Sequence, residues 1–154
     1  MRIALYQPDI PGNTGTIARM CACLGLPLDI IEPTGFRFDD ASLRRAGLDY
    51  LERAAIVRHA DWTHFLESHE RQGRRLVLLT TTADLSYTDF EYSPQDTLLF
   101  GRESAGAPDH VHQKADARLC IPMATTGRSL NLAISAAIVA GEAVRQVGLV
   151  NYES

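Results

Sequence analysis

The chain has 154 residues, of which 45% are hydrophobic and 22% are charged, and its formal net charge is −4. This length predicts a single domain over residues 1–154 that can bury a core without disulfide or metal support. The composition excludes a disordered chain, and the negative charge argues against a protein that coats itself in nucleic acid. A local basic patch for one short stretch of RNA stays open.

The N-terminal segment and the cysteines indicate the cellular compartment of the protein. The apolar run that follows Met1 stops at Pro8, which is too short for a signal peptide, and no later stretch is long enough to span a membrane. Cys21 and Cys23 are spaced C-x-C rather than C-x-x-C, and Cys120 stands alone. Unpaired thiols indicate a reducing compartment. We therefore expect a cytoplasmic protein with no membrane attachment.

Strand and helix patterns alternate along the chain. The predicted strands cover residues 3–6, 28–31, 54–57, 76–79, 97–100 and 119–121. The predicted helices run from a turn at residues 12–15 to Leu24, near residues 40–45, from about Asp61 to Gly73, and from about Leu130 to Val147. This order predicts an α/β fold with a mainly parallel sheet, helices on both faces, and ligands at the carboxyl ends of the strands.

The last predicted helix is unusual because it is apolar on almost every side up to Ala140. Such a helix must be buried on most sides. Small residues along it permit the close approach of another element: Ala133, Ala136, Ala137, Ala140 and Gly141. A packing helix inside one subunit and a helix at a subunit interface both fit this pattern.

Several common sites have no motif here. The chain lacks G-x-G-x-x-G after its first strand, G-x-x-x-x-G-K-[ST] and G-x-S-x-G. None of the five histidines has partners at metal-ligand spacing, and residues 110–112 beside Asp109 indicate a polar loop. The sequence therefore gives no support for a dinucleotide, Walker-type nucleotide, metal or serine hydrolase site.

Three loops follow apolar strands in the second half of the chain. One contains Gly101, Glu103 and Gly106, and the others cover residues 80–82 and 122–129. A glycine pair alone is more often a simple chain reversal, whereas Gly101 could let a ligand press against the main chain. Because the carboxyl ends of neighbouring parallel strands share one edge of a sheet, the three loops together predict one pocket.

The third loop leads directly into the last helix. Ser129 falls where a hydroxyl normally caps free amides, so capping alone explains it. Asn131 would lie inside the apolar helix, where an amide is costly unless it has a partner, and we interpret it as a functional residue.

Near the N-terminus, Asn13, Gly15 and Arg19 form the pattern N-x-G-x-x-x-R across a helix start. Free amides at such a start can hold a phosphate, and we expect Arg19 to project one turn in. An Asn or Thr cap followed by an exposed arginine fits equally well. A cluster of further arginines is either a local RNA-binding patch or ordinary solvated surface: Arg37, Arg44, Arg45, Arg53 and Arg58.

Taken together, N-x-G-x-x-x-R, L-x-F-G-x-E-x-x-G and I-P-M-x(5)-S-L-N-L resemble the three ordered motifs of the SPOUT methyltransferases. The likeness is greatest to the short tRNA 2′-O-methyltransferases that act on the wobble nucleotide, position 34, cytidine or modified uridine, of leucine tRNAs. Residues 31–33 and 44–50 belong to this likeness, which covers nearly the whole chain. The resemblance implies a C-terminal trefoil knot, S-adenosylmethionine as cofactor without a metal, and a homodimer.

The resemblance also implies residue roles. Cofactor binding is expected from Leu79, Gly101, Ile121 and Ser129, with Met123 and Leu130 lining the adenine cleft. The residues that match the family's catalytic positions are Arg19, Glu103, Ser129 and Asn131. RNA contacts are expected from Arg19, Arg44 and Arg45, with Arg19 reaching the site at the dimer interface.

The chain departs from the family pattern at two places. Arg102 stands where relatives often have proline, and Gly141 precedes Glu142 where many have an aromatic residue. Alternative functions that fit the sequence are a non-catalytic RNA-binding module of the same fold, a methyltransferase for another tRNA or rRNA ribose, and a flavodoxin-like nucleotide-binding domain.

Overall fold

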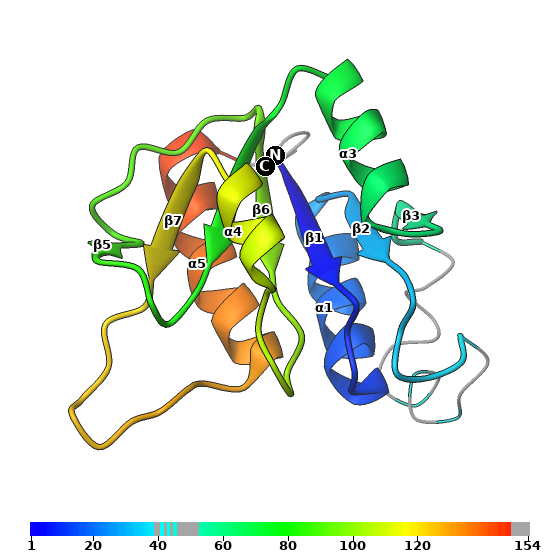
Figure 1. The fold of residues 1–154 in the computed structure, drawn as a ribbon, viewed down its shortest axis with the longest axis horizontal. Coiled ribbons are helices and arrows are strands. Elements are labelled where there is room, and N and C mark those ends of the chain that lie inside the picture. Colours follow the sequence, from blue (N-terminus) through cyan, green and yellow to red (C-terminus); the bar gives the residue numbers. More distant parts are fainter. Residues whose placement is uncertain (39–40, 42, 44, 46–52, 149–154) are drawn as a thin grey trace.

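The computed structural model describes residues 1–38, 41, 43, 45 and 53–148. Within these ranges, seven strands form one parallel sheet in the order β3-β2-β1-β6-β4-β7-β5 (Figure 1). The strands are β1 (Arg2–Tyr6), β2 (Leu28–Ile31), β3 (Ile56–His59), β4 (Arg75–Leu79), β5 (Leu85–Ser86), β6 (Asp96–Phe100) and β7 (Ala117–Cys120). The helices are α1 (Pro11–Leu24), α3 (Trp62–Arg71), α4 (Asp109–Lys114) and α5 (Leu132–Val147).

Both faces of the sheet are covered, which explains why its central strands are continuous apolar runs. On one face, α1 and α5 pack over Ile3, Leu5 and Leu98, and on the other, α3 and α4 pack over Ala4 and Leu99 (Figure 1). Consecutive residues of β1 thus enter different cores, as the two-residue period of a strand requires. The predicted α/β class, parallel sheet and two helical layers are confirmed.

Four predicted strands, the first, second, fourth and fifth, agree with β1, β2, β4 and β6 to within a residue. The third strand lies two residues later than expected, and β7 ends at Cys120, so Ile121 is already in the loop. The predicted polar loop at residues 110–112 is wrong, because these residues belong to α4 and Val111 is fully buried. The two-residue β5 was not predicted.

Two helix starts also differ from the expected ones. Helix α1 begins at Pro11, before the expected turn, because proline is well suited to the first helical position. Helix α5 begins at Leu132 and is capped by Asn131, so the expectation that Ser129 caps it is wrong. Of the short helix predicted near residues 40–45, the structure describes only Ala41, Leu43 and Arg45.

No helix within the described ranges is long and apolar enough to cross a membrane. The trefoil knot stays a prediction, because strand order and register do not trace how the C-terminal chain threads.

The central strand β6 should carry much of the stability. Leu98 is fully buried, so Leu98→Ala is expected to lower the free energy of unfolding by about 2–5 kcal/mol through lost burial and a residual cavity. Val57 on the edge strand β3 is 44% exposed, and Val57→Ala should change the free energy of unfolding by less than about 0.5 kcal/mol. Urea denaturation measures both, and equal effects would contradict the assignment of β6 to the core.

Candidate active site

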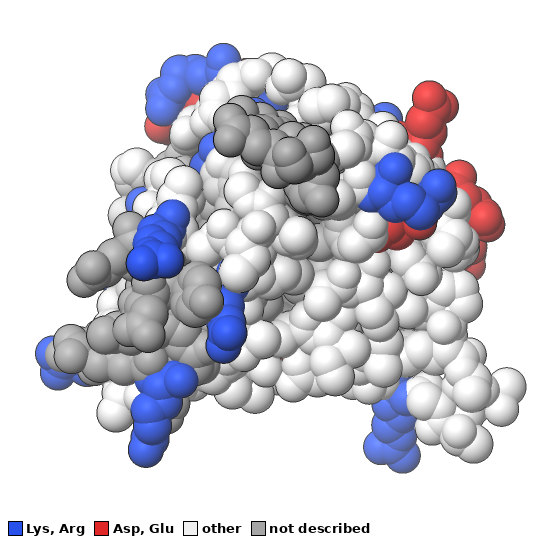
Figure 2. Space-filling view, turned by 180° about the vertical axis from the view of Figure 1, so that it is seen from behind, with Lys and Arg blue, Asp and Glu red and all other residues white. Residues whose placement is uncertain are grey.

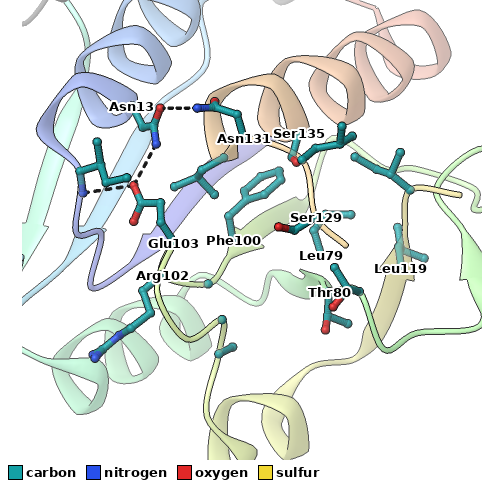
Figure 3. A pocket seen from close by; sticks show the side chains of 18 of the residues that line it. Asn13, Leu79, Thr80, Phe100, Arg102, Glu103, Leu119, Ser129, Asn131 and Ser135 are labelled. Atoms are coloured by element: carbon teal, nitrogen blue, oxygen red, sulfur yellow. Dashed lines mark hydrogen bonds between the residues drawn. The ribbon is translucent and has the colours of Figure 1, made fainter. Parts of the chain in front are cut away.

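A cavity of about 410 Å³ opens at the carboxyl edge of the sheet (Figure 3). Its walls come from the ends of β4, β6 and β7, from the loop that follows each strand, and from the starts of α1 and α5. The predicted meeting of the three loops at one pocket is therefore observed. The volume falls within the range of about 300–1,000 Å³ that is typical of small-molecule sites.

All six residues predicted to bind the cofactor line this cavity: Leu79, Gly101, Ile121, Met123, Ser129 and Leu130. Glu103 and Asn131 line it as well. Leu79, Ile121, Met123 and Leu130 give it an apolar wall, and Leu130 keeps 39% of its surface exposed. Hydroxyl groups of Thr80, Thr81 and Ser129 add polar positions.

The backbone of its own loop requires glycine at position 101. A Cβ at this position would lie 2.4 Å from the carbonyl carbon of Gly106 and 2.5 Å from the amide nitrogen of Ala107. Arg102 and Gly106 exchange two backbone hydrogen bonds, of 3.2 Å and 2.8 Å, that close this tight turn. The packing of the 101–107 loop therefore already requires glycine at this position, and contact between Gly101 and a ligand stays a prediction.

The carboxylate of Glu103 ties the β6–α4 loop to the start of α1. One oxygen accepts a hydrogen bond of 2.7 Å from the backbone amide of Asp9, and the other accepts from the amide of Ile10 at 3.3 Å. A carboxylate at this helix start is favoured by the helix dipole. It would also repel a second anion there, so the predicted phosphate site at the start of α1 is not supported.

A reciprocal contact strengthens this connection. The Asp9 carboxylate accepts hydrogen bonds from the hydroxyl of Ser104 at 2.6 Å and from its amide at 3.0 Å. These bonds, led by the hydroxyl, hold the pKa of the Asp9 carboxyl below its ordinary value. Gln7 has a φ of 45°, a left-handed conformation rare for a non-glycine residue, and this turns the chain sharply after β1.

Asn13 extends the network to the last helix. Asn13 is 9% exposed, and its side-chain nitrogen donates to the Glu103 carboxylate at 3.4 Å. Its side-chain oxygen accepts from the side-chain nitrogen of Asn131 at 3.0 Å (Figure 3). The Asn131 oxygen in turn accepts from the amides of Ala133 at 2.9 Å and Ile134 at 3.2 Å, which is the geometry of an N-cap. Asn131 is therefore a capping residue at the helix start, and the expectation that it lies inside the helix is wrong.

Of the arginines predicted to contact RNA, the structure describes Arg19 and Arg45, and neither lines the cavity. Arg19 is exposed on α1 and does not line the cavity of its own chain. It lies eight residues after Pro11, about two helical turns along α1 rather than one. Arg45 is exposed, and Arg44 lies outside the described residues.

Several lining residues were not predicted as site residues, among them Asn13, Phe100, Arg102 and Ser135. Ser135 could have been found, because it lies four residues after Asn131 and so shares its helix face. Asn13 opens the N-terminal motif, but its role could not be predicted, because its contacts lie 90 and 118 residues away along the chain. Among the described residues no group of three or more His, Cys, Asp or Glu side chains could hold a metal ion.

This combination of features defines the class of protein. A parallel α/β sheet with a cavity at its carboxyl edge is the arrangement in which such folds bind small ligands. Within that class the chain belongs to the SpoU rRNA methylase family, which matches residues 1–141.

Individual relatives are similar over nearly the whole chain. The tRNA (cytidine(34)-2'-O)-methyltransferase of Beijerinckia indica is 57% identical over 95% of this chain and 91% of its own length. A structure solved to study the 2-OH methylation of C/U34 on tRNA is 41% identical, with a TM-score of 0.90 and 94% of both chains covered. The methyltransferase AviRb of Streptomyces viridochromogenes, solved with AdoMet, is 28% identical with a TM-score of 0.88, over 95% of this chain and 60% of AviRb.

The Glu103 contacts should be measurable as stability. Glu103→Ala removes the acceptor of two backbone amides and of Asn13, and is expected to lower the free energy of unfolding by about 1–3 kcal/mol. Glu67 is an exposed glutamate on α3, and Glu67→Ala is the matched control with an effect below about 0.5 kcal/mol. If both variants unfold at the same urea concentration as the wild type, Glu103 does not hold the loop.

Proposed function

We propose that this protein is an S-adenosylmethionine-dependent methyltransferase that modifies the ribose 2′-hydroxyl of nucleotide 34 in tRNA, with leucine tRNAs as substrates. The observation that supports this most directly is the cavity formed by three loops at the ends of strands. Hydrogen bonds of Glu103, Asn13 and Asn131 join these loops to α1 and α5. The tRNA (cytidine(34)-2'-O)-methyltransferase at 57% identity supports this substrate over other RNAs. The nearly full-length match also supports one methyltransferase domain over residues 1–154.

The residues of the cavity fit the cofactor. The apolar wall of Leu79, Ile121, Met123 and Leu130 suits an adenine ring, and the hydroxyl-bearing side chains beside it suit the polar parts of the molecule. When bound, S-adenosylmethionine supplies a methyl group on a positively charged sulfur. The protein's main contribution is then to hold the ribose oxygen in line with that methyl group, which is a catalysis by positioning.

The charged and polar residues of the site have different roles. Both oxygens of Glu103 already accept backbone hydrogen bonds, so we assign it to shaping the site rather than to taking a proton. Ser129 and Asn131 lie on the cavity wall and would orient the hydroxyl or the cofactor. We assign Arg19 to binding an RNA phosphate, because a guanidinium in a protein rarely gives up its proton.

We further propose a homodimer formed through α1 and α5. Residues on one side of α5 are exposed in the single chain: Ile134, at 53%, Ala137 and Gly141. Figure 2 shows the face that these two helices cover, with a broad uncharged area bordered by Lys and Arg and with Asp and Glu mostly at one margin. A partner seated there would bring its Arg19 towards the cavity that Arg19 does not reach in its own chain.

The three cysteines, Cys21, Cys23 and Cys120, carry no disulfide. Free thiols support the proposed cytoplasmic location, where tRNA modification would take place.

Cofactor binding and methyl transfer test the function directly. Calorimetry should detect tight binding of S-adenosylhomocysteine, and methylation of leucine tRNA with product mapping should place the methyl group on ribose 34. Leucine tRNA substituted at nucleotide 34 is the matched substrate control. A chain that binds RNA but neither binds the cofactor product nor transfers methyl would be an RNA-binding module, and methylation at another ribose would contradict the proposed substrate.

The assignment of Arg19 makes a separate prediction. Arg19→Lys keeps the positive charge and should retain part of the kcat/KM for tRNA, whereas Arg19→Ala should lose it by about 100-fold or more. Binding of S-adenosylhomocysteine should be unchanged in both. A completely inactive Arg19→Lys variant with intact cofactor binding would contradict a charge-binding role.

A further inference from the structure

Three aromatic rings from different elements meet beside the cavity, on the face of the sheet opposite α1 and α5. Tyr6 ends β1, Trp62 begins α3, and His110 lies in α4. The ring centroids are separated by 5.7 Å between Tyr6 and Trp62, 6.3 Å between Tyr6 and His110, and 6.1 Å between Trp62 and His110. Tyr6 is buried, Trp62 is half-buried and His110 is exposed, so the cluster has one face towards solvent.

Arg102 connects this cluster to the cavity. It lines the cavity, and its guanidinium carbon lies 5.7 Å from the centroid of the Tyr6 ring. Its side chain points away from Asn13 and Glu103 (Figure 3). The Nε atom is buried and makes no hydrogen bond within the described part of the chain, although such a charged donor is normally paired.

The backbone holds Arg102 in this position. The tight turn to Gly106 fixes residue 102, and the same loop continues through Ala107 into α4, which carries His110. The nearby Asp9 carboxylate is engaged by two hydrogen bonds from Ser104. Arg102 is thus a cation at the rim of the cavity, placed against aromatic rings.

We propose that the rim surface, made of Trp62, Arg102 and His110 around the buried Tyr6, binds the nucleotide next to the one that is methylated. Single-stranded RNA is recognised by stacking of bases on aromatic rings and arginine planes and by cationic contacts to phosphate. The target ribose must enter the cavity, so its neighbour in the RNA chain lies at the rim. This proposal rests on the proposed function and names the residues that select and hold the substrate there.

The hydrophobic core does not need every residue of the rim surface. Phe65, which is 2% exposed, stacks against Trp62 at 5.4 Å and supplies the buried packing below it. His110 is exposed on α4, and the buried contact of that helix is made by Val111. Arg102 and His110 can therefore be changed without opening the core.

Trp62 provides the direct measurement, because it is the single tryptophan of the sequence. A synthetic anticodon stem-loop RNA should quench its fluorescence on binding. The same RNA lacking the base on either side of nucleotide 34 should show which neighbour causes the quenching. If the stem-loop binds, as measured by anisotropy, and Trp62 emission does not change, the rim surface is not the binding site.

Variants separate RNA binding from folding and cofactor binding. Arg102→Ala should raise the KM for tRNA about tenfold and reduce the slope of log affinity against log salt by about one, with Arg102→Lys intermediate. His110→Ala should raise KM less. Arg71 at the far end of α3 is an exposed arginine, and Arg71→Ala is the control with an unchanged KM.

Binding of S-adenosylhomocysteine should be unchanged in His110→Ala and Arg71→Ala, because neither residue lines the cavity. Wild-type KM values for Arg102→Ala and His110→Ala would overturn the proposal while leaving the methyltransferase function intact. A wild-type protein that neither binds nor methylates tRNA would overturn the proposed function, and the rim surface with it.

Discussion

The carboxylate of Glu103 is the contact on which the site depends. It joins the loop after β6 to the loop after β1, two segments that are 94 residues apart in the sequence. Through Asn13 the same carboxylate is coupled to Asn131, which caps α5. The cavity walls from β6 and from the start of α5 are therefore fixed relative to each other by one chain of hydrogen bonds. Such a network holds its parts together only while every member has its partner.

This arrangement changes how the motif residues should be understood. Glu103 and Asn131 lie on the cavity wall, but their polar atoms mostly contact other parts of the protein. Gly101 is likewise explained by the close approach of Gly106 and Ala107. Much of the sequence motif therefore encodes the shape of the site.

The sequence predicted the sheet well because buried parallel strands have a strong signal. Central strands such as β4 and β6 have both faces covered, which leaves continuous apolar runs that stand out from the polar loops. Helix α4 was missed because its six residues carry Val111 as their one fully buried apolar side chain, and β5 has only two residues. Short elements are stabilised by their tertiary contacts, which local patterns do not contain.

The site was predicted as a set of residues more accurately than as a set of contacts. Ser129 and Asn131 are both good capping residues, and nothing local shows that the helix starts after the second. The bond from Asn131 to Asn13 favours that start, across 118 positions. Similarly, a glycine in a loop does not show whether a ligand or the chain itself presses against it. In the sequence Arg102 is only a departure from the family pattern. Its position beside Tyr6 follows from the turn at Gly106, which a local pattern does not predict.

The coupling between Asn13 and Asn131 can be measured by a double-mutant cycle on the affinity for S-adenosylhomocysteine. Asn131→Ser keeps a capping hydroxyl but is too short to reach Asn13, and Asn13→Ala removes the acceptor. Calorimetry on the wild type, both single variants and the double variant gives the interaction energy. If the network holds the cleft, the two losses are non-additive by at least about 0.5 kcal/mol. Strictly additive losses, or unchanged affinities in all variants, would contradict a cleft held by this network.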